Sequence, residues 1–163
     1  MHDTIDRSYA DLPVLALFGG SMQRDCGDHT QALASAIEAD FVVAVVGLGG
    51  AEGEGHDRGG LTLPGTQVEL LTSLRAAMSR PGQKLVVVVV AAGPVDLNDT
   101  ALDAALFVGY GGQSAGYGAT DVIFGKVSPS GRFATTVYQE SYLSQVGPIM
   151  DYSSTSGVGR TYR

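Results

Sequence analysis

The chain has 163 residues, of which 44% are hydrophobic and 17% are charged, and a domain of this size buries roughly 70% of the surface that its unfolded chain exposes. Its mean hydropathy of +0.12 excludes disorder over most of the length, because disordered chains combine low hydrophobicity with high charge. Ten Lys and Arg against 17 Asp and Glu give a formal charge of -7 and no basic stripe. Nucleic acid is therefore not an expected partner.

The sequence predicts no membrane segment, no metal site and no cofactor. Its longest apolar run, residues 85–92, has eight residues, whereas a membrane-spanning helix needs about 20. The single cysteine, Cys26, cannot form an internal disulfide, and no Cys/His spacing typical of zinc occurs. The opening residues MHDTIDRSYADLP lack a basic start and an apolar stretch, so no signal peptide is expected here, and the localisation stays open.

The first half of the chain reads as alternating strands and helices. Residues 14–18 predict a strand, and residues 28–40 predict a helix with Asp28 as N-cap and with Leu33, Ala36 and Ile37 on one face. A second strand is expected at residues 41–48.

The second half continues the alternation. A helix is expected over residues 64–80, with Pro64 in its first position and a buried stripe of apolar side chains (Leu70, Leu71, Leu74, Ala77 and Met78). Residues 85–92 and 105–108 predict strands, and residues 114–124 predict a helix that ends at Gly125 in a left-handed conformation. The weak alternation of residues 132–138 predicts an edge-like strand.

These elements predict one α/β domain over residues 1–163. The Val-rich runs at 14–18, 41–48 and 85–92 show no alternation of apolar and polar residues, which is typical of parallel strands covered by helices on both faces. We therefore expect a three-layer α/β/α sandwich around a mostly parallel sheet with right-handed crossovers. Ligands of such sheets bind at the carboxyl ends of the strands.

The loop after the second expected strand holds a dense cluster of ionisable side chains: Glu52, Glu54, His56, Asp57 and Arg58. A glutamate on such a loop can act as a general acid when a partly dry pocket raises its pKa toward the working pH. The alternative is structural: Asp57 and Arg58 stabilise the loop by local hydrogen bonds, while both glutamates are solvated. His56 fits a proton shuttle, a sugar contact or a bystander on a polar loop.

A glycine-rich stretch, GYGGQSAGYG at residues 109–118, precedes the third expected helix. Glycines before a helix start are compatible with phosphate binding. However, the stretch lacks the Lys-Ser/Thr ending of a Walker loop and follows the fourth strand instead of the first. We interpret its glycines as positions of close packing between loop and sheet.

Four ordered blocks carry a family resemblance over about residues 32–163: EGEGHDRGGLTLPGTQVELL, LVVVVVAAGPVDL, FVGYGGQSAGYGATDVIFGKVSPSGRFATTVY and GVGRTYR. In sequence and spacing they resemble the C-terminal α/β sandwich domain of family 3 glycoside hydrolases, in the β-xylosidase and β-glucosidase branch. The resemblance implies part of a retaining exo-glycosidase that removes β-linked xylosyl, glucosyl or arabinosyl units from the non-reducing ends of oligosaccharides. Family members are often secreted, and the implied enzyme needs no cofactor.

The resemblance also implies a division of catalytic work. Retaining glycosidases use two carboxyl groups about 5 to 5.5 Å apart. In this family the nucleophile is an aspartate on a separate (β/α)₈ barrel, which needs ~250 residues of its own and is not encoded in this chain. The matching acid/base is Glu52, with Glu54 as its rival because the loop is one residue short, and His56, Asp57 and Arg58 match substrate-binding or loop-supporting positions.

Departures from the family pattern lead to further expectations. The first βα unit and the C-terminal end are expected to be truncated, so that the chain is a fragment that partners with a barrel domain on the same or another polypeptide and is inactive alone. Gly50 and Ala51 replace bulkier residues before Glu52. Two alternatives remain: a non-catalytic remnant of such an enzyme, and a flavodoxin-like binder of a nucleotide or flavin, since fold alone does not define function.

Overall fold

The computed structural model describes residues 14–18, 29–49, 52, 55–97 and 100–145. Within these residues four strands form one parallel sheet in the order β1-β2-β3-β4. The strands are β1 (Val14–Phe18), β2 (Phe41–Gly47), β3 (Lys84–Val90) and β4 (Ala104–Phe107). The helices are α1 (Thr30–Glu38), α2 (Gln67–Ala77), α3 (Ala115–Ile123) and the 3₁₀ helix η2 (Glu140–Gln145).

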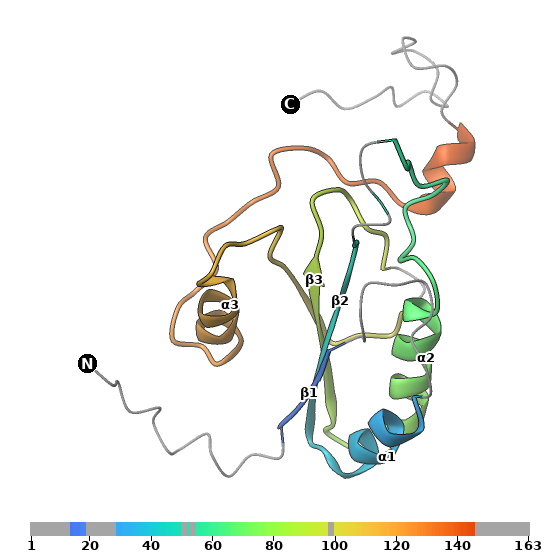
Figure 1. Ribbon diagram of the computed structural model, residues 1–163. Helices are drawn as coiled ribbons and strands as arrows, with labels where there is room; N and C mark the ends of the chain where they lie inside the picture. Colours follow the sequence, from blue (N-terminus) through green and yellow to red (C-terminus); the bar gives the residue numbers. More distant parts are fainter. Residues whose placement is uncertain (1–13, 19–28, 50–51, 53–54, 98–99, 146–163) are drawn as a thin grey trace.

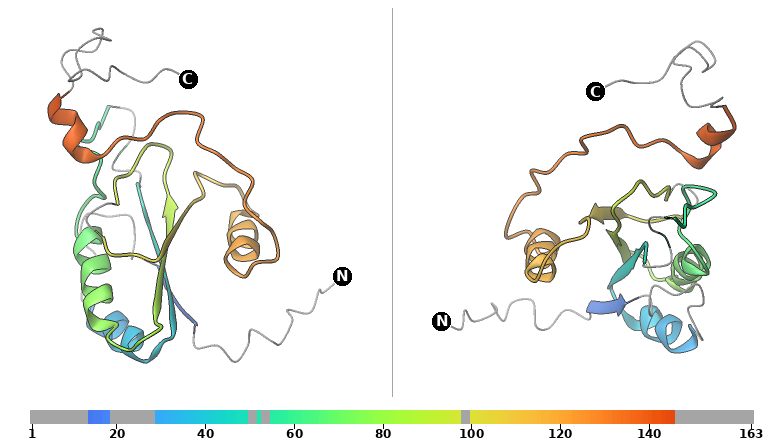
Figure 2. Two further views of the ribbon diagram at one scale, coloured as in Figure 1. Left: turned by 180° about the vertical axis from the view of Figure 1, so that it is seen from behind. Right: turned by 45° about the horizontal axis from the view of Figure 1, so that its top comes forward.

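The helices lie on both faces of the sheet. Helices α1 and α2 pack side by side on one face, and α3 lies on the opposite side (Figures 1 and 2). This arrangement confirms the predicted three-layer α/β/α sandwich. Because all described strands run parallel, their carboxyl ends meet at one edge, where the loops after β2, β3 and β4 gather. No helix in the described ranges is long and apolar enough to cross a membrane.

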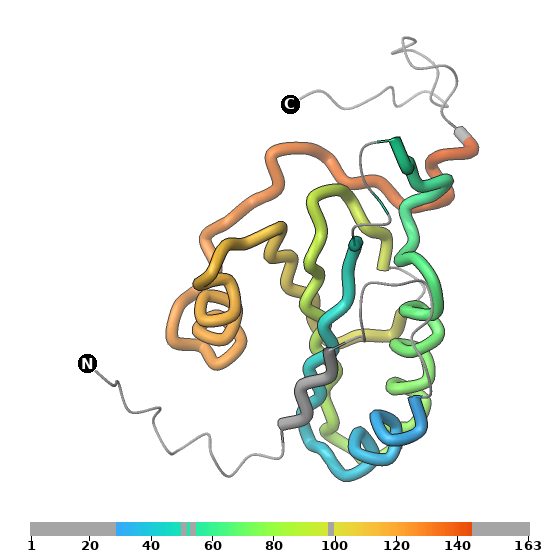
Figure 3. The backbone as a smooth tube through the Cα atoms, in the orientation of Figure 1, coloured from blue at the N-terminus to red at the C-terminus, as the bar shows by residue number. Residues whose placement is uncertain are grey.

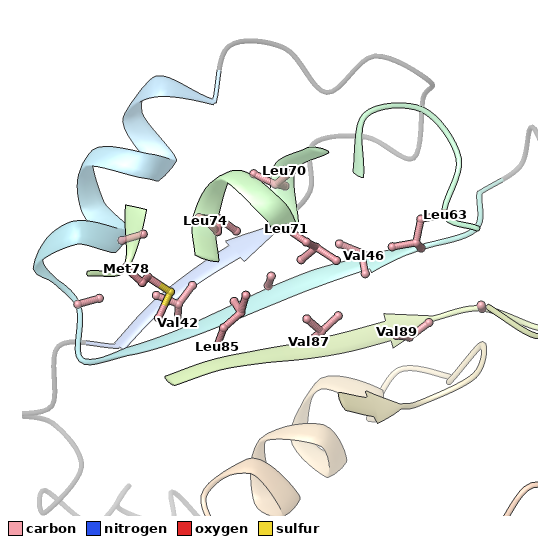
Figure 4. Packing of buried hydrophobic residues seen from close by; sticks show 14 of the residues in the cluster. Val42, Val46, Leu63, Leu70, Leu71, Leu74, Met78, Leu85, Val87 and Val89 are labelled. Carbon is pink, nitrogen blue, oxygen red and sulfur yellow. The ribbon is translucent and has the colours of Figure 1, made fainter. Parts of the chain in front are cut away.

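The hydrophobic core fills the space between the sheet and the α1–α2 layer (Figure 4). Alternate residues of β2 and β3 point into it, and α2 contributes one stripe of side chains. Its members include Val42, Ala44, Val46, Leu70, Leu71, Leu74, Met78, Leu85, Val87 and Val89. Burying each such Val, Leu or Met side chain stabilises the fold by roughly 1.5 to 3 kcal/mol. The buried stripe predicted for α2 is thereby confirmed, although Ala77 is only half-buried.

Two helix predictions were wrong in detail. Helix α2 begins at Gln67 instead of Pro64, because Gly65 takes a φ of +62°, which no helix residue adopts. Ile37 of α1 is 45% exposed, so it does not share the buried face of Ala36. The predicted N-cap Asp28 lies outside the described residues, and the left-handed Gly125 at the end of α3 is confirmed by its φ of +72°.

The predicted strand at residues 132–138 was wrong. This stretch belongs to the connection from α3 to η2, which arches across the carboxyl edge of the sheet (Figure 3), and residues 129–136 are exposed. Phe133 makes an edge contact with Phe107 of β4, with ring centroids 5.0 Å apart. The weak alternation of this stretch supplies few apolar side chains to bury, so little favours a regular strand there.

Candidate active site

The buried side chain of Gln67 binds the last residue of β2. Gly47, the last residue of β2, donates its N–H to Oε1 of Gln67 at 2.7 Å, and Nε2 of Gln67 donates to the carbonyl of Gly47 at 2.9 Å. The same Nε2 donates to the carbonyl of Pro64 at 3.2 Å. Gln67 is only 6% exposed. The loop that follows β2 therefore starts from a fixed point.

Sequence reasoning missed Gln67. A signal was present: Gln67 continues the spacing of the buried stripe Leu70, Leu71 and Leu74, yet it is polar. A polar side chain at a core position needs a hydrogen-bonding partner, and that need pointed to a buried backbone group nearby.

Glu52 lies at the start of the loop and folds back onto it. Its Oε2 accepts a hydrogen bond from the N–H of Gly49 at 3.0 Å, and its own N–H donates to the carbonyl of Gly49 at 3.1 Å. The side chain is half-buried. Hydrogen bonds to an ionised carboxylate are stronger than those between neutral groups, so this contact gives the carboxylate a defined place beside the end of β2.

Glu52, His56, Asp57 and Arg58 line one pocket of about 320 Å³ at the carboxyl end of β2. Three glycines and residues 62–64 complete its wall. The structure thus brings four of the five predicted residues together, and the fifth, Glu54, lies outside the described residues. The described part of residues 49–63 contains no helix or strand, so the pocket is a loop structure.

Arg58 connects two loops. Its Nη1 donates to the carbonyl of Thr62 at 3.2 Å, and its Nη2 donates to the carbonyl of Pro94, in the loop after β3, at 2.7 Å. His56 and Asp57 are exposed, and the carboxylate of Asp57 has no hydrogen-bond partner in the described part of the chain. Arg58 therefore fits the loop-stabilising alternative, but through backbone carbonyls and without Asp57.

A second connection, not predicted, comes from η2. The carboxylate of Glu140 accepts a hydrogen bond from the N–H of Leu61 and lies against Gly60, where a Cβ would be 2.4 Å from Oε1 of Glu140. Asp96 in turn accepts the N–H of Glu140 through Oδ2 at 2.5 Å and donates its own N–H to the carbonyl of Leu61 at 2.8 Å. Hydrogen bonds therefore join η2 to the loops after β2 and β3, at residues next to the pocket wall.

A larger pocket of about 870 Å³ lies between β4, α3 and residues 127–134. Its lining is apolar apart from two serines and Arg132, its only ionisable side chain. It offers no carboxylate for acid/base chemistry, so the smaller pocket is the candidate site. Within the described ranges no three His, Cys, Asp or Glu side chains gather as a metal site would require.

Fold and pocket together define an α/β/α sandwich domain that presents a positioned carboxylate on the loop after its second described strand. The sequence profile of the glycosyl hydrolase family 3 C-terminal domain matches residues 10–162. The chain belongs to this family.

Relatives agree with this assignment. The chain is 37% identical over 139 residues to a probable β-D-xylosidase 7 of Arabidopsis thaliana, covering 82% of the chain and 18% of that protein. A solved family 3 exo-β-xylosidase, XlnD, bound to a xylobiose aziridine probe, aligns with a TM-score of 0.69 and 31% identity over 86% of the chain and 19% of that protein. A β-glucosidase of Bifidobacterium adolescentis aligns with a TM-score of 0.64 and 37% identity over 75% of the chain and 18% of that protein. The chain thus spans less than a fifth of each.

Proposed function

We propose that this chain is the sandwich portion of a retaining exo-glycosidase that removes β-linked xylosyl or glucosyl units from the non-reducing ends of oligosaccharides, with Glu52 as its acid/base. The proposal rests on one observation: Glu52 is half-buried, anchored to the N–H of Gly49, and lines a pocket with His56, Asp57 and Arg58. The names of the relatives, β-xylosidases and β-glucosidases, support the substrate class.

In the proposed reaction Glu52 donates a proton in the first step and accepts one in the second. As the nucleophile's carboxylate bonds to the anomeric carbon, the bond to the leaving oxygen breaks, and protonated Glu52 gives its proton to that oxygen. In the second step, ionised Glu52 takes a proton from the water that attacks the anomeric carbon, which releases the sugar and the nucleophile. A general acid of this kind contributes about 10²- to 10⁴-fold to the rate.

The nucleophile belongs to a partner, which we propose is a (β/α)₈ barrel domain on the same or another polypeptide. A single general acid without a nucleophile and without further sugar contacts lacks the positional and electrostatic stabilisation on which the reaction depends. We therefore expect the 163-residue chain to release no sugar by itself.

The test is reconstitution. The full chain is mixed with the separately produced barrel portion of a relative, and xylose release from xylobiose is measured. We expect restored hydrolysis, a loss of at least about 100-fold for Glu52→Gln, and wild-type rates for the control Glu69→Gln, which changes an exposed glutamate on α2. Azide, a nucleophile that needs no general base, should restore turnover of an activated aryl xyloside by the Glu52→Gln mixture.

The outcomes separate the alternatives. If Glu54→Gln abolishes hydrolysis and Glu52→Gln does not, Glu54 is the acid/base. If no mixture releases sugar although the two parts bind each other, the chain is a non-catalytic domain and the proposed function is wrong.

A further inference from the structure

The peptide group between Leu48 and Gly49 lies where β2 turns into the site loop. Both residues are buried, and the N–H of Leu48 makes the last strand-like hydrogen bond of this segment, to the carbonyl of Val90 at 3.0 Å. Beyond that bond the carbonyl of Leu48 and the N–H of Gly49 have left the sheet ladder. Buried backbone groups of this kind require partners from elsewhere.

Two side chains provide those partners. The hydroxyl of Tyr110 donates to the carbonyl of Leu48 at 3.2 Å, and the N–H of Gly49 donates to Oε2 of Glu52 at 3.0 Å. Since the carbonyl and the N–H of a trans peptide point in opposite directions, the three groups form a chain: Tyr110 hydroxyl, peptide group, Glu52 carboxylate. A hydrogen bond to the carbonyl polarises the peptide and strengthens its N–H as a donor.

Tyr110 reaches this position from another strand. It lies in the loop after β4, directly after Gly109, whose φ of +64° turns the chain there. In the sheet β4 is separated from β2 by β3, so the tyrosine side chain reaches across the carboxyl end of β3. Tyr110 is 56% exposed, so the core does not depend on its ring.

We propose that Tyr110 is a positioning residue for Glu52: its hydroxyl orients the Leu48–Gly49 peptide group, and that group holds the Glu52 carboxylate for proton transfer. This inference rests on the proposed function, since it concerns the same acid/base. It assigns to Tyr110 no contact with the sugar.

The first experiment measures the hydrogen-bond chain in the isolated 163-residue chain. Backbone amide exchange is followed by NMR for the wild type, for Tyr110→Phe and for the matched control Tyr117→Phe, since Tyr117 on α3 is 78% exposed. We expect Tyr110→Phe to speed exchange of the Gly49 amide about tenfold, the effect of one net hydrogen bond, while the Leu48 amide is unchanged. An unchanged Gly49 amide, or an equal effect of Tyr117→Phe, overturns the proposal.

The second experiment separates positioning from a merely structural role. In the reconstituted mixture, xylobiose needs a proton on its leaving oxygen, whereas 2,4-dinitrophenyl β-xyloside departs without one. We expect Tyr110→Phe to lower kcat for glycosylation by xylobiose about tenfold, with KM unchanged, and to leave the glycosylation rate of the dinitrophenyl substrate unchanged.

The two possible failures differ. A wild-type chain that restores no hydrolysis rejects the proposed function, and the role of Tyr110 with it. A wild-type chain that works, while Tyr110→Phe affects both substrates equally or neither, rejects this inference alone.

Discussion

Gln67, the first residue of α2, is bound through both polar atoms of its amide to Gly47, the last residue of β2, at 2.7 and 2.9 Å. The pair imitates a strand ladder: the side-chain amide takes the place of a neighbouring peptide group. Because Gly47 and Gln67 are both buried, neither has water as an alternative partner. The start of the candidate site loop is therefore fixed by a helix that follows the loop in the sequence.

Gln67→Leu removes these hydrogen bonds but fills the same position with an apolar side chain of similar size. We expect the free energy of unfolding to fall by about 2 to 3 kcal/mol, because the N–H and carbonyl of Gly47 are left buried without partners. Urea denaturation at pH 7 measures the change. The control Glu69→Gln, exposed on the same helix, should change stability by less than about 0.5 kcal/mol. A loss for Gln67→Leu as small as that of the control would contradict the importance of the pair.

Gly47 and Gly118 form a second matched test. A Cβ at Gly47 would be 1.9 Å from the carbonyl oxygen of Val90, a backbone atom that cannot move without breaking the sheet. We expect Gly47→Ala to destabilise the fold by more than about 3 kcal/mol or to prevent folding. At Gly118 in α3 a Cβ would meet nothing within 4 Å. There alanine should stabilise the protein by roughly 0.5 to 1 kcal/mol through its higher helix propensity.

Thermal unfolding by circular dichroism checks both glycine variants. A soluble, cooperatively folding Gly47→Ala protein with an unchanged Tm would show that β2 and β3 do not approach as closely as described.

Asp103 lies at the end of the sheet opposite the candidate site, and its contacts predict that the stability of the fold depends on pH. The N–H of Leu85, a hydrogen bond from Lys84, and the charges of Lys84 and Arg75 hold the pKa of Asp103 below its usual 3.8, although partial burial opposes them. A lowered pKa in the folded state stabilises the protein above pH 3.8, and this contribution is lost as the pH falls through the lower, folded-state pKa.

The corresponding variant is Asp103→Asn. We expect it to be about 1 kcal/mol less stable than the wild type at pH 7, and we expect the difference to shrink as the pH falls below 3.8. Urea denaturation at several pH values measures it. Asp40→Asn is the control, since Asp40 pairs with Arg80 but its side chain is 61% exposed. A constant difference between Asp103→Asn and the wild type over this pH range would refute the linkage.

The hydrogen bonds of Arg58 predict that the loops after β2 and β3 stabilise each other. Arg58→Ala removes the bonds to Thr62 and Pro94, so amide exchange by mass spectrometry should be faster in peptides covering residues 59–63 and 94–97. Lys is a point charge that cannot spread two donors as a guanidinium does, so Arg58→Lys should resemble Arg58→Ala. Arg132→Ala should leave both peptides unchanged, because Arg132 bonds to the carbonyl of the preceding residue. Normal protection in Arg58→Ala would mean that the loops are stable without the guanidinium.

Much of the fold was predictable because its information is local. The Val-rich runs that became β2 and β3 are buried on both faces, and such runs can be recognised without knowledge of their neighbours. The stripe of α2 was equally visible, although its start was misplaced because Gly65 takes a left-handed conformation. Residues 132–138 were mispredicted because weak alternation alone does not establish a pairing partner.

The candidate site was also predictable only in part. The sequence by itself determined that Glu52, His56, Asp57 and Arg58 would lie together, because they are within seven residues of one another. Only the tertiary structure decided what holds them: the partners of Gly47, Leu48 and Leu61 lie 20, 62 and 79 residues farther along the chain. Contacts at such separations arise from the packing of helices and loops around the edge where the parallel strands end. The polar Gln67 at a core position indicated the need for a partner, but no local pattern of residue types specifies which group that partner is.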